Sequence, residues 1–250
     1  MDDEELLEGG NASGAVVRVG QTVRKPWTRT TSRVVEFMAA LRTRGIDLPG
    51  THGGDDQGRL VLDYVPGTMA IDIAPLPDDI VRKIGALVRA IHDASAPLGV
   101  PGDWPDGVLP APQRELICHN DRATWNLVID DGRLVLIDWD GAAPSSRLWD
   151  LAYAATAFAH LFPHADVKAS ARRLRAFLDG YEADFDLRAA LPEALEQRAQ
   201  AMFDLLHESH TTTGLQPWAT MYREGHGEHW RNTTQFIVEH HRVWTLAIRG

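Results

Sequence analysis

Residues 117–126 read Ile-Cys-His-Asn-Asp-Arg-Ala-Thr-Trp-Asn, and residues 137–141 read Ile-Asp-Trp-Asp-Gly. These two stretches carry most of the information about the fold and the chemistry of this chain. Asp121 and Asn126 stand on an expected loop between strands, and Asp138 ends the next strand but one. Three oxygen-bearing side chains therefore come from a short piece of sequence.

A hairpin is expected between the two stretches. The apolar runs 127–129 and 134–137 flank the segment 130–133, Asp-Asp-Gly-Arg, and Asp-Gly is a strong hairpin turn signal. The open end of such a hairpin would bring Asn126 and Asp138 together. Carboxylate and amide oxygens of this kind are ligands that Mg²⁺ prefers. The spacing therefore indicates a possible metal site.

The first third of the chain is expected to form a small sheet with one helix. The runs 15–19 and 22–25 are strand-like and predict a hairpin. Apolar residues then recur at helical spacing after Ser32, a plausible N-cap, until Gly45, where a left-handed residue suits a helix end. A further strand is expected at 60–65.

A boundary between two lobes is expected after that strand. The segment 53–58, before the strand, is rich in turn residues, and Pro66-Gly67 ends the strand. We therefore expect a first lobe over residues 1–66 and a second lobe over residues 67–250.

The second lobe is expected to be mostly helical. Asp78 precedes a helical apolar stripe, residues 94–113 form a proline-rich loop, and 116–118 is a short strand. Everything from Ser146 onward reads as helices. The longest apolar stretch, 148–162, is too short to cross a bilayer, so no membrane partner is expected.

Composition narrows the class of protein. The 250 residues include 25 Lys and Arg against 35 Asp and Glu, a net charge of −10, which argues against nucleic acid as a partner and favours a small cationic one. The only cysteine, Cys118, excludes an internal disulfide. This cysteine usage and the acidic residues 1–5 predict a cytoplasmic protein. The sequence carries no signal for an oligomeric state.

The pattern His-x-Asp-x-x-x-x-Asn, followed by a hairpin and Ile-Asp-Trp, resembles the catalytic and metal-binding loops of protein-kinase-like phosphotransferases. The branch it is most similar to is the aminoglycoside phosphotransferase family. Asn120 stands where that family usually has Gly, and Asn is the best non-glycine choice if the position needs positive φ. Further agreement lies in three segments, 62–67, 87–92 and 148–152.

The resemblance implies a fold and an activity. The fold would be an α+β, two-lobed protein-kinase-like one with a small antiparallel sheet and a mostly helical second lobe. The activity would be transfer of the γ-phosphoryl of ATP (or GTP) to a hydroxyl of a small, cationic molecule such as an aminoglycoside. Asp121 would be the catalytic base, and Asn126 and Asp138 would hold Mg²⁺. Asp150 would brace the catalytic loop, and His119 would be structural.

The same resemblance assigns nucleotide contacts in the first lobe. Asn11 and Ser13, in a Gly-rich run, would donate hydrogen bonds to phosphates. The phosphate-gripping cation is either Arg24 or Lys25, and the residues leave this choice open. Glu36, the only acid in the following helix, is a candidate partner for that cation.

The remaining contacts concern the adenine base of the nucleotide and the acceptor molecule. The backbone of Asp63 and Val65, or of a neighbour, would face the adenine. An acidic cleft for a polyamine-like acceptor is expected near the C-terminus, with these candidate residues: Asp204, Glu208, Glu224 and Glu228.

Two alternative functions remain open on the same fold. One is a metabolite kinase acting on choline, homoserine or a sugar amine. The other is a nucleotide-binding pseudokinase without turnover, motivated by the ambiguous cation and the weak glycine loop. Zinc at the histidine pairs 207/210 and 226/229 is disfavoured, because no third ligand is spaced near either pair.

Overall fold

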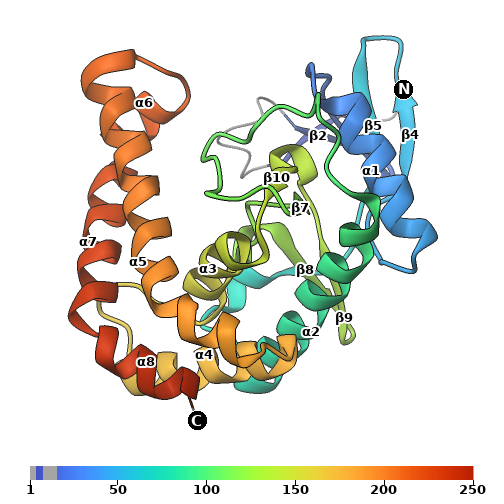
Figure 1. The fold of residues 1–250 in the computed structure, drawn as a ribbon. Coiled ribbons are helices and arrows are strands. Elements are labelled where there is room, and N and C mark those ends of the chain that lie inside the picture. The colour runs from blue at the N-terminus through green and yellow to red at the C-terminus, as the bar shows by residue number, and fades with distance from the viewer. Residues whose placement is uncertain (1–3, 8–15, 250) are drawn as a thin grey trace.

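The computed structural model describes residues 4–7 and 16–249, so Asn11 and Ser13 lie outside the described residues. A small antiparallel sheet with one helix forms the first lobe, and the second lobe is larger and mostly helical (Figure 1). The α+β, two-lobed arrangement expected from the sequence is confirmed.

The first lobe is built on a five-stranded sheet of order β1-β2-β3-β5-β4, in which every pair is antiparallel. Its strands are β1 (Glu5–Leu6), β2 (Val17–Val19), β3 (Thr22–Pro26), β4 (Thr51–Gly54) and β5 (Arg59–Asp63). Helix α1 (Thr31–Thr43) follows the β2–β3 hairpin, as expected. It buries Val34, Phe37, Met38 and Leu41.

Two details of this lobe differ from expectation. Helix α1 begins at Thr31 with Thr30 in the N-cap position, so Ser32 is not the cap. Gly53 and Gly54 were expected in a turn but belong to β4, an edge strand whose register against β5 is irregular. Edge strands pair through their backbones, so apolar alternation is not needed there. The left-handed conformation expected at Gly45 is confirmed by its φ of +85°.

Short strands position the two segments of the second lobe that carry the sequence motif. Strand β6 (Thr68–Met69) pairs with β8 (Leu127–Asp130), which forms the expected hairpin with β9 (Arg133–Leu136). Strand β7 (Leu116–Cys118) pairs with β10 (Ala143–Ser145), a strand that sequence patterns did not indicate. Short 3-10 turns occupy Ala70–Ile73, Ala96–Leu98, Thr124–Asn126 and Trp139–Gly141.

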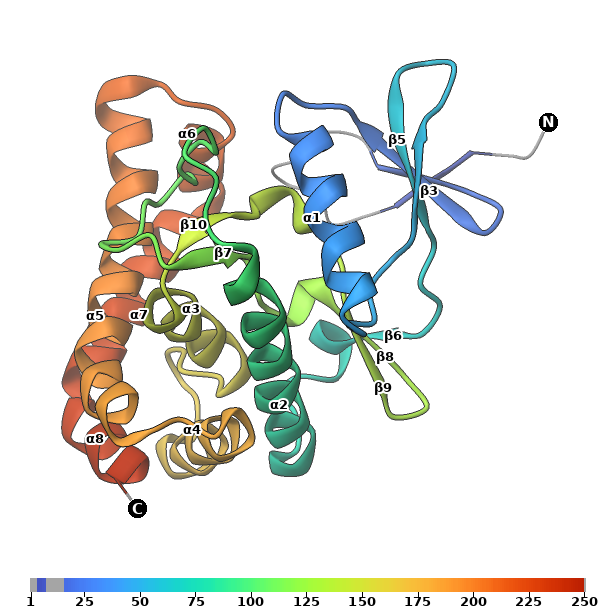
Figure 2. The ribbon, with the colours of Figure 1, turned by 45° about the vertical axis from the view of Figure 1, so that its right-hand side comes forward.

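Helices make up most of the second lobe. They are α2 (Asp78–Ser95), α3 (Arg147–Phe158), α4 (Val167–Tyr181), α5 (Phe185–Glu208), α6 (Trp218–Met221), α7 (Gly227–Glu239) and α8 (His241–Arg249). Single π-helical segments, Ser209–Thr213 and Tyr222–His226, flank α6. Residues 185–239, here called the helical arm, stand across from the sheet lobe (Figures 1 and 2).

Helices α2 and α4 pack closely because each carries a glycine at the crossing. A Cβ on Gly180 would overlap the carbonyl oxygen of Arg82, and one on Gly85 would overlap that of Phe177. Within the described residues, no helix is both long and apolar enough to span a membrane.

Candidate active site

The loop between β7 and β8 carries the sequence motif and is held from several sides. Asn120 has a φ of +64°, so the expected positive φ is confirmed. Its side-chain amide lies within hydrogen-bonding distance of the carbonyl oxygens of Cys118, Gly141 and Ala143, at 3.2, 3.2 and 3.1 Å. Its backbone N–H donates to Asp150 Oδ1 at 2.8 Å. The turn before Asp121 is therefore rigid.

Asp121 lies partly exposed on this loop with a donor on each carboxylate oxygen. Tyr153 Oη donates to Oδ1 at 2.9 Å, and Asn126 Nδ2 donates to Oδ2 at 2.8 Å. Burial raises the pKa of Asp121 to about 6; the Tyr153 hydrogen bond opposes this shift and the nearby Asp138 charge adds to it.

Asn126 and Asp138 flank the open end of the hairpin, where Ile137 N–H donates to the Asn126 carbonyl oxygen at 3.0 Å. Asp138 itself has a φ of +56°, a left-handed conformation that turns the chain after the strand. The Asn126 side-chain Nδ2 donates hydrogen bonds to the backbone carbonyl oxygen and to Oδ2 of Asp121. Within the described part of the chain, Asn126 Oδ1 accepts no hydrogen bond, so it is available to a ligand.

Lys25 reaches the site from the first lobe. Its Nζ lies 2.7 Å from Asp138 Oδ1 and 2.7 Å from Asp140 Oδ2. The lysine side chain is 5% exposed, whereas the aspartate side chains are 31% and 29% exposed. Burial works against the charged amine, but attraction to Asp138 and Asp140 prevails and raises the pKa of Lys25.

Of the two cations of β3, Lys25 is the one that reaches Asp138. Arg24 points to the other face of the strand, where its Nε lies 3.6 Å from Asp55 Oδ2. Neighbouring side chains on a strand alternate between faces, so only one of the two can reach the site. Sequence analysis assigned no role to Asp140, although it follows Asp138 by two residues.

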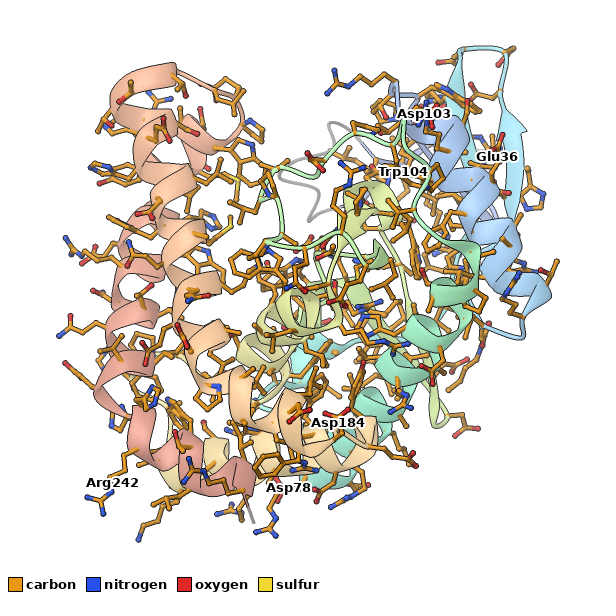
Figure 3. All side chains as sticks on the ribbon, viewed as in Figure 1. Glu36, Asp78, Asp103, Trp104, Asp184 and Arg242 are labelled. Atoms are coloured by element: carbon orange, nitrogen blue, oxygen red, sulfur yellow. The ribbon has the colours of Figure 1, made fainter. Side chains whose placement is uncertain are left out.

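The suggested pairing of Glu36 with this cation is wrong. Glu36 is exposed and lines, with Asp103 and Trp104, a pocket between α1 and the loop after α2 (Figure 3). Lys25 takes its acidic partners from the segment after β9 instead. The rotation of α1 about its axis turns Phe37 and Met38 inward and leaves Glu36 outside.

The segment expected to face the adenine is partly engaged in the first lobe. Asp63 N–H donates to the Gly50 carbonyl oxygen at 2.9 Å, and its carboxylate contacts Gly50 N–H and His52 at 2.8 and 2.7 Å. The backbone N–H of Asp63 is thus not free to donate a hydrogen bond to the adenine. Among the described residues, no acceptor is found for Val65 N–H, so this group can meet a ligand.

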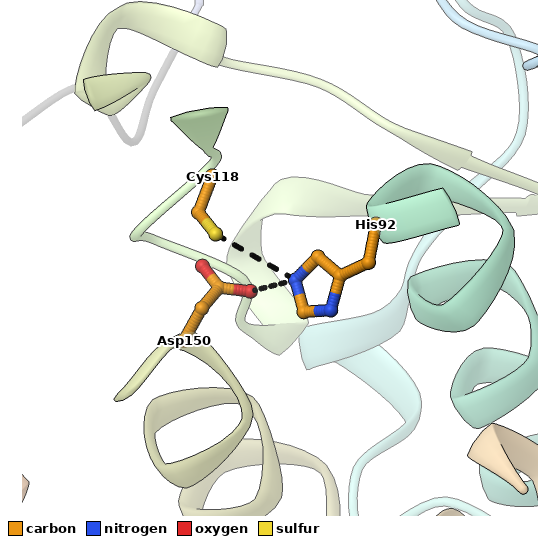
Figure 4. Close-up of side chains that lie close together, drawn as sticks. All are labelled: His92, Cys118 and Asp150. Atoms are coloured by element: carbon orange, nitrogen blue, oxygen red, sulfur yellow. Dashed lines mark hydrogen bonds and ion pairs between the residues drawn. The ribbon is translucent and has the colours of Figure 1, made fainter. Parts of the chain in front are cut away.

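A buried network lies under the catalytic loop (Figure 4). Asp150, 1% exposed, forms an ion pair with Arg122 and lies 3.0 Å from His92 Nε2. Burial, reinforced by the Arg122 charge, lowers the pKa of His92 well below its usual value. Neutral His92 can accept from Arg122 Nη1 at 2.8 Å and donate from Nδ1 to Tyr181 Oη at 2.9 Å.

This network has the composition of a metal site but is filled by a guanidinium. Ligand atoms of His92, Cys118 and Asp150 lie within 4.8 Å of one another. The Arg122 side chain contacts both His92 and Asp150, however, and supplies the positive charge there. We therefore interpret the network as the support of the catalytic loop.

His119 is fully buried beside this loop. Its Nε2 lies 3.0 Å from the Ile137 carbonyl oxygen, its Nδ1 accepts from Asp121 N–H at 3.3 Å, and its ring lies 4.7 Å from that of Trp139. Burial lowers the pKa of His119 to about 4. The ring is therefore neutral and ties the loop to the segment that carries Asp138.

The acids suggested for acceptor binding lie on the helical arm. Glu208, Glu224 and Glu228 are all exposed, and Glu228 lies 3.7 Å from Arg231. None of the hydrogen bonds or ion pairs found among the described residues joins them to the catalytic loop. Asp204 is also exposed and accepts from Gln200 at 2.7 Å.

The arm instead reaches the loop through Arg198, which sequence analysis missed. This side chain is buried, its Nη2 lies 3.5 Å from the Asn120 carbonyl oxygen, and its guanidinium lies 4.4 Å from the Tyr153 ring centroid. A signal was available, since Arg198 interrupts the apolar stripe that runs from Leu195 to Leu206. Tyr153 had no such signal, because α3 is apolar around most of its circumference.

Comparisons with known proteins agree with this fold. Residues 102–192 match the sequence model of the phosphotransferase enzyme family, and no curated protein sequence matches the chain. A microcompartment-associated aminopropanol kinase superposes with a TM-score of 0.67 at 14% identity, covering 98% of this chain and 94% of that one.

Two further solved structures have the same arrangement. An amicoumacin kinase in complex with AMP-PNP, Ca²⁺ and Ami has a TM-score of 0.64 at 15% identity, with 94% and 88% of the two chains covered. A putative aminoglycoside phosphotransferase from Ralstonia eutropha has a TM-score of 0.62 at 13% identity, with 96% and 93% covered. The chain is thus similar to the phosphotransferase enzyme family over the segment that holds the catalytic loop, and it has the protein-kinase-like fold of small-molecule kinases.

Proposed function

We propose that this protein is a kinase that transfers the γ-phosphoryl group of ATP (or GTP) to a hydroxyl of a small, amine-bearing molecule. The family match and the kinase neighbours support an ATP-dependent small-molecule kinase. The observation that carries the proposal is that Lys25 contacts Asp138 and Asn126 contacts Asp121, while Ile137, the residue before Asp138, donates its N–H to the Asn126 carbonyl oxygen. It joins a cation from one lobe to a carboxylate base on the other.

Asp121 is the proposed catalytic base. Its carboxylate is partly exposed and lies on the loop segment that carries the sequence motif. It can therefore orient the acceptor hydroxyl and take its proton. Phosphoryl transfer depends mainly on positioning and charge neutralisation, so a fixed carboxylate is suited to this role.

Asn126 and Asp138 are the proposed ligands of Mg²⁺. The residues fit that ion, because Asn126 Oδ1 is available as a ligand and the Asp138 side chain is 31% exposed. Bound there, the ion would neutralise charge on the β- and γ-phosphates. Lys25 would contribute a positive charge to the same phosphates. Val65 N–H is the proposed hydrogen-bond donor to the nucleobase.

The acceptor is proposed from the charge of the chain and from its neighbours. The net charge of −10 and the exposed acids of the helical arm, Glu208, Glu224 and Glu228, favour a cationic molecule. The neighbours include an aminopropanol kinase and a putative aminoglycoside phosphotransferase. We therefore propose two candidate acceptors, an aminoglycoside and an amino alcohol; the second corresponds to the metabolite-kinase alternative. The cytoplasmic location stays a prediction.

The proposal is tested by nucleotide consumption with a panel of alcohols: aminoglycosides, choline, ethanolamine, aminopropanol and homoserine. We expect acceptor-dependent ADP formation that requires a divalent cation and is lost in Asp121→Ala and Asn126→Ala. Phosphorylated product is identified by ³¹P NMR. Full turnover in Asp121→Ala would reject the assigned base. Nucleotide-induced thermal stabilisation without any turnover would favour the pseudokinase alternative.

A further inference from the structure

Tyr153 touches the proposed base, although nothing in the sequence motif assigns it a role. It lies on α3, and its hydroxyl donates to Asp121 Oδ1 at 2.9 Å. The residue is buried, with 5% of its surface exposed. A buried phenol needs a hydrogen-bond partner, and here that partner is the carboxylate that would receive the acceptor proton.

Asn126 and Tyr153 donate to different oxygens of Asp121, and the Trp125 side chain adds a further hydrogen bond to this carboxylate. Asn126 Nδ2 contacts Oδ2 at 2.8 Å and comes from the same loop as Asp121, whereas Tyr153 contacts Oδ1 from a separate helix. A carboxylate held by one donor can rotate about its Cβ–Cγ bond, because this terminal torsion is broad. A second donor on the other oxygen fixes the plane of the group.

Tyr153 is itself held from the helical arm. The guanidinium of Arg198, on α5, lies 4.4 Å from the centre of its ring. Trp230, on α7, stacks on it with ring centres 5.9 Å apart and planes inclined by 18°. Arg198 and Trp230 are each 5% exposed, so these contacts are dry and mutually packed.

Arg198 also approaches the loop itself. Its Nη2 lies 3.5 Å from the Asn120 carbonyl oxygen, one residue before the base. Its Nη1 is buried and finds no hydrogen-bond partner among the described residues. A buried guanidinium with an unused N–H is costly, which indicates that its position serves the ring and loop beside it.

We propose that Tyr153 is a positioning residue for Asp121, held against the carboxylate by Arg198 and Trp230 of the helical arm. The inference rests on the proposed function, in which Asp121 receives the proton of the acceptor hydroxyl. It links the helical arm to the base through one side chain. Movement of the arm would therefore shift the base.

Tyr153→Phe tests this link, because it removes the hydroxyl and keeps the ring that packs on Arg198 and Trp230. We expect kcat to fall about tenfold or more, since small misplacement of a reacting group is expensive. KM for the nucleotide should stay within about twofold. Thr156→Val is the matched control: it removes another buried hydroxyl of α3, whose hydrogen bond goes to the Ala152 carbonyl oxygen. It should keep kcat within about twofold.

Arg198 is tested by Arg198→Met and Arg198→Lys. We expect Arg198→Met to lower kcat, and Arg198→Lys to restore part of it, because an ammonium also interacts with an aromatic face. If Arg198 acts through Tyr153, the double variant Tyr153→Phe/Arg198→Met should lose less activity than the product of the single losses. Losses that multiply fully would overturn the role of Arg198.

A readout without turnover separates this inference from the proposed function. The Tyr153 hydroxyl proton should give a slowly exchanging NMR resonance that disappears in Asp121→Ala and in Tyr153→Phe. Its absence in the wild type, an unchanged kcat in Tyr153→Phe, or an equal loss in Thr156→Val would each overturn the inference. If the resonance is present but the wild type phosphorylates no alcohol, the proposed function fails and the contact stands.

Discussion

Replacing Lys25 by Met tests the junction of the two lobes most directly. Its Nζ lies 2.7 Å from one oxygen each of Asp138 and Asp140, and its side chain is 5% exposed, so solvent screens it little. A hydrogen bond to a charged group contributes about 1.5–3 kcal/mol. At about 1.36 kcal/mol for each factor of ten, loss of one such contact to a phosphate lowers kcat/KM for the nucleotide roughly 10- to 150-fold.

The fold should tolerate this change. Met is apolar and similar in length, and the aspartates left behind keep 31% and 29% of their side-chain surface in water. Because the lysine itself is buried, we expect the free energy of unfolding to fall by about 1.5–3 kcal/mol, which leaves the protein folded. Urea denaturation of both proteins checks this point and excludes misfolding as the cause of lost activity.

The neighbouring residue supplies the control. Arg24→Met removes a cation of the same strand whose nearest acid, Asp55, lies 3.6 Å away on the opposite face. Partly exposed ion pairs contribute about 0–1 kcal/mol, so kcat/KM should stay within about threefold of the wild type. Initial rates of ADP formation at varied nucleotide concentration compare the variants. Equal losses in Arg24→Met and Lys25→Met would refute the assignment.

Four further outcomes are expected. Asp150→Ala leaves the buried Arg122 unpaired and should destabilise the fold by about 3–5 kcal/mol in urea titrations. An unchanged stability in this variant would contradict the proposed support of the loop. Gly180→Ala should lower the melting temperature because its Cβ overlaps a backbone oxygen of α2, whereas Gly102→Ala, with open space around it, should not. Because the pKa of Asp121 is raised to about 6, kcat/KM should fall as the pH decreases through about 6 and the carboxylate becomes protonated; a profile flat down to pH 5 would argue against this base. Burial raises the pKa of Cys118 to about 12, so its thiol should resist iodoacetamide at neutral pH until the protein is unfolded, as mass spectrometry can show.

Local patterns sufficed for the catalytic segment. Asp121, Asn126 and the turn after strand β8 are near one another in sequence, so loop and hairpin geometry alone bring them close. Asn120 could be assigned its positive φ for the same reason. Edge strand β4 and strand β10 escaped prediction, because their pairing depends on backbone contacts with partners that their own side chains do not indicate.

Side-chain direction was harder to predict than secondary structure. The residues at 24 and 25 are both cations, and choosing between them requires knowing which face of β3 is turned toward the second lobe. Glu36 was proposed as the partner of that cation because it is the only acid in α1, but packing of α1 turns it outward. Asp140 takes part beside Asp138 because the 3-10 turn at Trp139–Gly141 brings it back toward Lys25.

The sequence by itself determined the loop before β8, the hairpin behind it and the class of fold, since turns and hydrogen bonds over a few residues follow from local residue types. Only the tertiary structure decided which cation meets Asp138 and that Tyr153 and Arg198 stand behind Asp121. Those contacts join residues 113 and 32 positions apart in the pairs Lys25–Asp138 and Asp121–Tyr153. Their geometry follows from how lobes and helices pack, which no local pattern specifies.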